Sequence, residues 1–230
     1  MTDSPVQTRP RTVLLCLCLI IAPLAEIVEA VLSPLTGGST ADDLGGIAAA
    51  PDRFVASVLI GLLGTCLLVP ALLGLAHRAS ERSPRLALVA SAAVVVSLLG
   101  FAGVRMAQAF ELQLATGTLA RGDAALIMDG AVGNPIGSTL TLMFLGGNVI
   151  GIVVLVIALW RSRRVPVGAL ILFVLFPVVD LALHGHVGPI VSHVVLLAAM
   201  SWMAVGLLRR PVTPRNRART RRDAGAARAA

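Results

Sequence analysis

TLTLMFLGGNVIGIVVLVIALW, residues 139–160, contains no charged side chain and is followed directly by the basic segment Arg161-Ser162-Arg163-Arg164. A helix needs roughly 20 consecutive apolar residues to cross the hydrocarbon core of a bilayer. Within that core the backbone must satisfy its own hydrogen bonds, and a helix does so. This stretch therefore predicts a transmembrane helix.

Further apolar runs of similar length occupy most of the remaining chain: residues 12–32, 54–76, 86–104, 165–183 and 189–208. The third of them can continue as a helix past Arg105 to about Leu114. With 57% hydrophobic and 13% charged residues, the 230-residue chain is too apolar for an ordinary soluble domain. We expect an all-α, polytopic membrane helix bundle of six transmembrane helices, with residues 12–208 as the transmembrane domain.

Arginines are distributed unevenly over the connections between these runs. One side of the predicted membrane holds only Arg53, Arg105 and Arg121, and the other holds the remaining 16 of the 19 basic residues. Short cytoplasmic loops retain positive charge, so we expect a multi-pass protein of the plasma membrane with both termini cytoplasmic. Residues 1–11 would form the cytoplasmic N-terminus.

Residues 209–230 form a basic tail that has no apolar face to bury, and we expect it to be disordered and cytoplasmic. Its arginines would contact anionic lipid headgroups. Much of the net charge of +7 belongs to this tail and not to a folded surface, so the charge does not indicate nucleic acid as a partner.

Two of the connections are predicted to contain short helices. Thr40, followed three residues later by Asp43, is similar to a capping box, and Pro51 ends the helix that it would begin. In the longest connection, residues 115–138, the apolar side chains of Leu119, Leu126, Ile127 and Met128 suggest a helix lying at the membrane interface.

Small residues within the predicted spans would let helices approach one another closely. These are Gly61 and Gly64, Gly100 and Gly103, and Gly147 and Gly151. Only the last pair has GxxxG spacing. We expect packing within one chain and not a dimer interface.

Ionisable residues inside apolar runs are the first candidates for a site, because each costs about 2.5–3.5 kcal/mol near the bilayer centre. Glu26 and Glu29 are three residues apart and share a helix face, while Arg105 and Glu111 lie near the same outer level. We predict an intramembrane polar cluster of Glu26, Glu29, Arg105 and Glu111, in which Arg105 neutralises Glu26 or Glu111.

A second group surrounds the turn between the last two runs: Asp180, His184, His186 and His193. Asp180 and His184 are four residues apart, and Asp180 and His193 come out at the same depth. In one hypothesis these residues bind zinc or another divalent metal. In the other, which we favour, Asp180 pairs with His193, the remaining histidines lie at the interface and no cofactor is bound.

The sequence offers little support for several classes of function. It contains no nucleotide-binding loop, nucleophile elbow or paired-cysteine metal motif. The acids do not continue into the cytoplasmic half, so a proton path through the membrane is poorly supported. A small carrier would require discontinuous helices, for which Pro70 and Pro177 are the candidate breaks.

Three short segments carry a resemblance: Ala50-Pro51-Asp52-Arg53-Phe54, Val69-Pro70-Ala71-Leu72-Leu73-Gly74-Leu75, and Ala158-Leu159-Trp160-Arg161-Ser162 with Val165-Pro166. On these, the chain resembles a group of six-span hypothetical membrane proteins from GC-rich bacteria. That group has no established activity, so the resemblance implies a topology and no catalytic residue. We expect a non-enzymatic binding, transport-accessory or structural component in the lipid bilayer. The alternative is a metal-binding protein or metal-dependent membrane enzyme.

Overall fold

The computed structural model describes residues 10–163, 165–183 and 185–209, and these residues form eight α-helices. In chain order they are α1 (Pro10–Leu32), α2 (Thr40–Ala49), α3 (Pro51–Ser80), α4 (Pro84–Thr116), α5 (Arg121–Gly133), α6 (Pro135–Ser162), α7 (Val167–Ala182) and α8 (Val187–Arg209). Five of them, α1, α3, α4, α6 and α8, are long and apolar enough to cross a membrane. The architecture is that of a helical membrane bundle.

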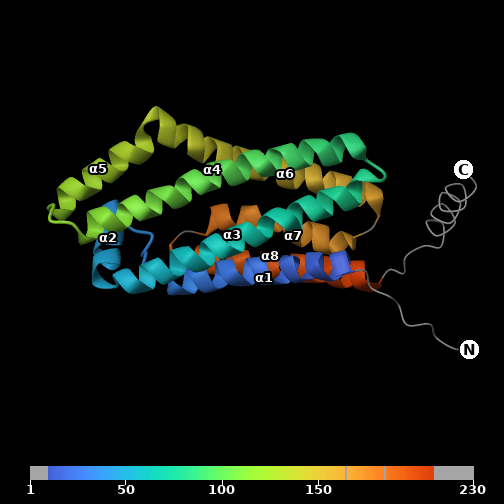
Figure 1. Ribbon diagram of the computed structural model, residues 1–230, viewed down its shortest axis with the longest axis horizontal. Helices are drawn as coiled ribbons and strands as arrows, with labels where there is room; N and C mark the ends of the chain where they lie inside the picture. The colour runs from blue at the N-terminus through green and yellow to red at the C-terminus, as the bar shows by residue number, and fades with distance from the viewer. Residues whose placement is uncertain (1–9, 164, 184, 210–230) are drawn as a thin grey trace, which may run out of the picture.

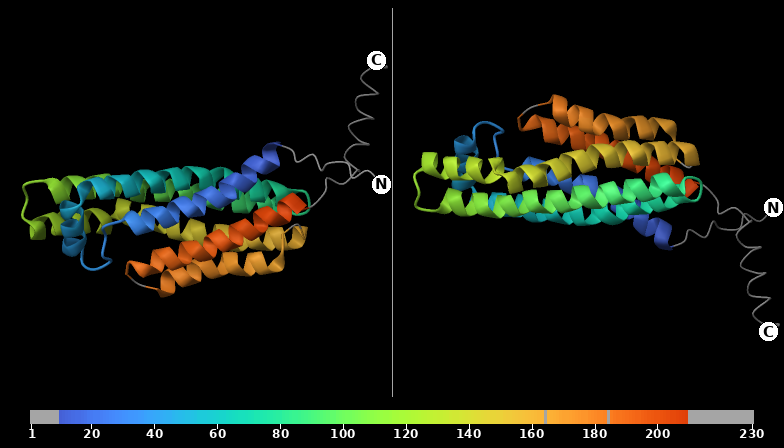
Figure 2. Two further views of the ribbon diagram at one scale, coloured as in Figure 1. Left: turned by 90° about the horizontal axis from the view of Figure 1, so that it is seen from below. Right: turned by 90° about the horizontal axis from the view of Figure 1, so that it is seen from above.

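The apolar helices are arranged as a ring. Along the chain α1 packs on α3, α3 on α4, α4 on α6, α6 on α7 and α7 on α8, and α8 then packs back on α1. Figure 1 shows these helices running along the long axis, with α2 and α5 at one end. Figure 2 shows α7 and α8 as a pair along one side of the bundle. The start of α1 and the end of α8 lie together at the end opposite α2 and α5.

The predicted spans agree with the helices in position, with one difference in length. The uncharged run at residues 139–160 lies inside α6, and the third run does continue as a helix past Arg105 to Thr116. The run at residues 165–183 forms only the 16-residue α7, roughly 24 Å long at 1.5 Å per residue. The structure thus has five long apolar helices and a shorter sixth. The predicted tail at 209–230 lies outside the described residues apart from Arg209, as do residues 1–9 of the N-terminal segment.

Glycine determines how closely α4 and α6 pack. A Cβ atom added at Gly100 would lie 2.5 Å from the backbone nitrogen of Phe144, and one at Gly147 would lie 2.8 Å from that of Ser97. Because backbone atoms cannot move aside as a flexible side chain can, a larger residue would separate the helices. The Ser97 hydroxyl donates a 3.0 Å hydrogen bond to the Phe144 carbonyl at this contact. The prediction that these glycines serve intramolecular packing is confirmed here.

The short helices α2 and α5, with the hydrogen-bonded loop before α2, form a small cap at one end of the bundle. The predicted helix after Ser39 is present, but its capping box uses Ser39 and Asp42, one residue earlier than predicted. Asp43 instead accepts hydrogen bonds from Thr36 and from the backbone of Gly37. The short helix predicted within residues 115–138 is also present, as α5.

At the opposite end the bundle has an apolar interior. Side chains of all six apolar helices meet there, and the largest of them that are fully buried include Leu19, Leu75, Leu155, Leu159 and Met203. Arg78 donates a 2.7 Å hydrogen bond to Thr12 at this end and ties α3 to the first turn of α1. The buried charged residues of the described chain, Glu26 and Arg105, lie farther along the bundle.

Candidate functional site

A buried ionic cluster joins α1 to α4. Arg105 on α4 makes ion pairs with both Glu26 and Glu29 on α1. Its Nη2 lies 3.2 Å from Glu26 Oε2, and its Nη1 also donates to the side-chain oxygen of Gln108 at 3.2 Å. Both guanidinium terminal nitrogens bond to Glu29, one to each carboxylate oxygen. The structure thus brings together three of the four residues of the predicted cluster.

The cluster fits into the bundle because α3 offers two glycines where it passes α1. A Cβ atom at Gly61 would lie 2.6 Å from Arg105 Nη2 and would overlap the Glu29 carboxylate. A Cβ atom at Gly64 would lie 2.7 Å from Glu26 Oε1. The two glycines therefore provide the space in which the three charged side chains meet.

Glu26 and Glu29 are held differently. Glu29 forms a bidentate ion pair with Arg105, in which each carboxylate oxygen accepts from one terminal nitrogen of the guanidinium. Glu26 has one contact to Arg105, and its other oxygen is 3.4 Å from the Thr65 hydroxyl. That hydroxyl has a single proton to donate and is closer, at 2.9 Å, to the carbonyl of Gly61. Glu26 Oε1 thus lacks a strong donor although the side chain is only 5% exposed.

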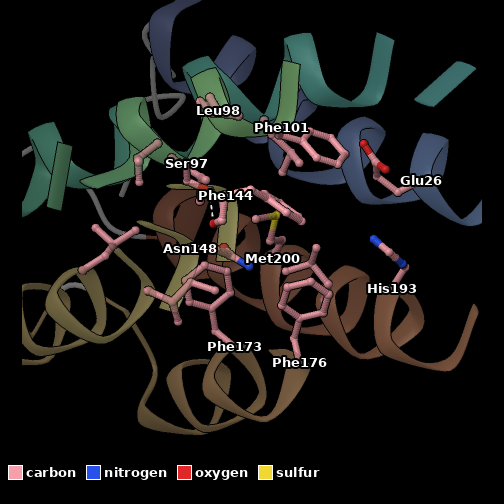
Figure 3. A pocket seen from close by; sticks show the side chains of 16 residues that line it. Glu26, Ser97, Leu98, Phe101, Phe144, Asn148, Phe173, Phe176, His193 and Met200 are labelled. Atoms are coloured by element: carbon pink, nitrogen blue, oxygen red, sulfur yellow. Dashed lines mark hydrogen bonds between the residues drawn. The ribbon is translucent and has the colours of Figure 1, made fainter. Parts of the chain in front are cut away.

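Beside Glu26 lies a cavity of about 100 Å³ at the centre of the ring. Every one of the six apolar helices contributes to its wall, from Glu26 on α1 to His193 on α8. Four phenylalanines from three helices line it: Phe101, Phe144, Phe173 and Phe176. Figure 3 shows Glu26 and His193 toward one end and Asn148 among the aromatic rings. The cavity is a mostly apolar chamber with a carboxylate and an imidazole at one end.

Aromatic contacts link the cavity to the ionic cluster. Phe101 and Phe144 stack with ring centroids 4.7 Å apart, and the Arg105 guanidinium carbon lies 4.6 Å from the centroid of Phe101. Such an arrangement is attractive because the ring face is electron-rich. Asn148 makes no hydrogen bond to another described residue, so its amide is available to a molecule in the cavity.

The cluster and the adjoining end of the cavity lie far from the arginine-rich turns. Counting from Thr12, which contacts Arg78, Glu26 is roughly 21 Å farther along α1 at 1.5 Å per residue. The hydrocarbon core is roughly 30 Å thick. If the arginine-rich turns lie at one membrane surface, the cluster lies in the opposite leaflet.

Glu111, the fourth predicted member of the cluster, does not join it. It lies six residues beyond Arg105 on α4, and its charged neighbour is Asp43 in the cap. Arg105 pairs with Glu29 in addition to Glu26, because the glycines of α3 leave room for side chains of α1 and α4 to meet. Of the two predicted partners, Glu26 or Glu111, Arg105 pairs with Glu26.

The residues around the α7–α8 turn are not brought together as a metal site in the described part of the chain. Asp180 accepts a 2.8 Å hydrogen bond from Ser192, and His193 Nδ1 lies 2.6 Å from the carbonyl of Pro189. Asp180 thus pairs with Ser192, the residue before His193, and not with His193 as expected. Among the described residues, no three His, Cys, Asp or Glu side chains could hold a metal ion. His184 lies outside them, so zinc binding, which would also involve His186, stays a prediction.

No protein-family model, curated protein or solved structure matches this chain. Its function must therefore be argued from the bundle itself. The resemblance to six-span bacterial membrane proteins likewise stays a prediction.

The ionic cluster could be anticipated from the sequence, whereas the cavity could not. Charged residues in apolar runs are conspicuous, whereas Phe101, Phe144, Phe173 and Phe176 are ordinary members of such runs. They account for four of the 6 phenylalanines in the chain, yet they come from three helices at unrelated spacings. Only the ring arrangement shows that they surround one space.

Proposed function

We propose that this protein is a non-enzymatic, membrane-embedded binding protein whose central cavity takes up a small, largely apolar molecule. The six apolar helices, including the shorter α7, cross the bilayer with both chain ends in the cytoplasm, and the lipid-facing surface is apolar. The cavity lined by all six of these helices is the observation that carries the proposal. Ligand sites in helical bundles are built in this way, between facing helices.

The charge distribution supports the orientation. Basic residues of the described chain gather at the end where α1 begins and α8 ends, among them Arg78, Arg82, Arg85 and Arg161. Such a bias is typical of the cytoplasmic side. The bilayer can thin locally to match a span as short as α7, at a modest cost in free energy.

The dimensions and lining support a ligand of roughly one ring in size. An apolar cavity of roughly 150 Å³ in a soluble protein is known to accept benzene, and the cavity here, at about 100 Å³, is of that order. Its wall consists mainly of aromatic and aliphatic side chains with a few polar groups, which is the usual composition of a small-molecule site.

The carrier hypothesis has less support. Pro70 and Pro177, the candidate breaks, both lie inside continuous helices. A kink at either proline remains compatible with binding, because neighbouring helices can satisfy the freed backbone groups. We therefore assign binding, and not transport through discontinuous helices, to the cavity.

The test uses 4-fluorotoluene as a neutral, one-ring probe of protein in lipid nanodiscs, observed by ¹⁹F NMR. We expect a saturable bound resonance of one probe per chain, distinct from probe dissolved in lipid. Replacement Leu68→Trp fills the cavity from α3 and should abolish that resonance. Leu63→Trp, on the same helix but 56% exposed, is the matched control and should retain it. Absence of saturable binding, or equal loss in both variants, contradicts the proposal.

A further inference from the structure

We infer that the preferred ligand is a small organic cation, and that it binds in exchange for a proton carried by Glu26. This inference rests on the proposed binding function and specifies its substrate class. It is carried by the cavity, by the unequal pairing of two carboxylates with one guanidinium, and by the aromatic wall.

The first step is the charge balance. Glu26 and Glu29 would carry two negative charges when ionised, and Arg105 supplies one positive charge. An uncompensated charge in the membrane interior is expensive, so the cluster needs either a proton or a second cation. Since Glu29 holds Arg105 with both oxygens, the excess charge belongs to Glu26.

The second step is access. Of the three charged residues in the cluster, Glu26 is the one that lines the cavity. Its carboxyl also lies against that of Glu29, and its Oε1 has the long contact to Thr65, so Glu26 can share a proton with Glu29 or face a cation in the cavity. The charged and titratable neighbours are Glu29 on its own helix, Arg105 on α4 and His193 at the same end of the cavity on α8; α3 contributes only the neutral Thr65 and two glycines.

The third step is the wall. Phenylalanine rings attract cations, and desolvated aromatic cages recognise quaternary ammonium groups by this attraction. The four phenylalanines line the cavity wall, and Phe176 contacts His193 at the end that also holds Glu26. A strongly hydrated metal ion would find few oxygen ligands here, whereas an organic cation can leave water at lower cost. The lining therefore fits an alkylammonium with an apolar body.

The exchange is balanced in charge and protons. In the empty cavity Glu26 is a neutral carboxylic acid. When the cation enters, the acid releases its proton to water and the carboxylate faces the cation, so the charge of the site with its contents is unchanged. Cation affinity should consequently rise with pH, by about tenfold per pH unit over the range in which the empty site is protonated.

The test compares two probes with the same ring and fluorine reporter in nanodiscs. One is 4-fluorobenzyltrimethylammonium, and the other is its uncharged carbon isostere, 1-fluoro-4-neopentylbenzene. We expect the cation to bind at least tenfold more tightly at pH 8 than at pH 6, and the isostere to be indifferent to pH. Glu26→Gln should remove cation binding and its pH dependence while leaving binding of the isostere. Glu111→Gln, a carboxylate on α4 outside the cavity, is the control and should change neither.

The outcomes separate this inference from the proposed function. If the isostere binds and the cation does not, or if the cation binds equally at both pH values, the inference is overturned while the binding function stands. If neither these probes nor 4-fluorotoluene bind, the binding function itself fails. If the pH dependence survives in Glu26→Gln and disappears in His193→Gln, the exchanged proton belongs to His193 and the assignment to Glu26 is wrong.

Discussion

The two ends of this helix ring are held together by different contacts. Toward the arginine-rich turns the buried side chains are apolar, with Leu75, Leu155 and Leu159 fully enclosed. Toward the cap, Glu26, Glu29 and Arg105 connect α1 to α4 through ion pairs. Lipid tails are as apolar as leucine, so apolar side chains alone give little preference for one helix neighbour over another. The difference indicates that polar and close-backbone contacts determine which helices meet and in which register.

The largest effect is expected from breaking the ionic cluster at its cation. Arg105→Gln leaves the buried Glu29 carboxylate beside Glu26 without its counter-charge, and should lower the free energy of unfolding by about 3–5 kcal/mol. Far-UV circular dichroism during SDS titration of mixed micelles measures this loss.

Two further variants make that result interpretable. Arg53→Gln, which removes an exposed arginine bonded to the Val31 carbonyl, should cost much less. Adding Glu26→Gln and Glu29→Gln to Arg105→Gln should recover most of the lost stability, since a neutral polar cluster leaves no buried charge unpaired. An Arg105→Gln protein as stable as Arg53→Gln would show that the two ends do not differ as described.

An intermediate effect is expected midway along the bundle, where α4 and α6 meet backbone to backbone. Gly147→Ala places a methyl group against Ser97 and should cost about 1–3 kcal/mol as the helices are forced apart. The adjacent Gly146 has open space around it, so Gly146→Ala should be neutral or stabilising by up to roughly 1 kcal/mol. The same SDS titration compares the two. Equal behaviour of these neighbours would argue against close packing at this level.

The smallest effect is expected in the cap. The side chain and backbone of Ser39 donate hydrogen bonds that hold the pKa of Asp42 below its usual value. A carboxyl with a lowered pKa contributes stability above its unfolded pKa and loses it as pH falls through the folded one. Amide exchange in α2, corrected for intrinsic rates, should therefore accelerate below about pH 4. Asp42→Asn should remove this pH dependence, and Asp52→Asn should preserve it; persistence in Asp42→Asn would assign it to another group.

Much of the helical architecture could be predicted from the sequence, because the signal is local. An apolar run such as residues 139–160 is sufficient to define a helix, whatever surrounds it. The cap shows where local signals become ambiguous. In Ser39-Thr40-Ala41-Asp42-Asp43, both Ser39 and Thr40 are followed by an acid three positions later, so either could be the N-cap. Ser39 is the N-cap, because Asp43 accepts hydrogen bonds from Thr36 and Gly37 instead.

The partners within the site depended on the arrangement of helices, which the sequence does not state. Arg105 was predicted to neutralise Glu26 or Glu111, and it pairs with Glu26 and also with Glu29. The pairing with Glu29 depends on the space that Gly61 of α3 leaves at the contact. Similarly, counting from the α7–α8 turn predicts a partner for Asp180 to within one residue, and the rotation of α8 selects Ser192 over His193.

Because α8 packs on α1, the apolar helices follow one another in a closed circle. The chain could therefore begin and end at another turn of the circle and still contain the same neighbouring helices. Pro10 and Arg209 lie at the same end of neighbouring helices. A chain opened instead in the turn between α3 and α4, with the present ends joined by a flexible linker, would keep all pairs of neighbouring helices. Its new termini would emerge on the same side of the membrane as the old ones. The assembly is thus specified by adjacency around the ring, and a permuted gene would encode the same cavity.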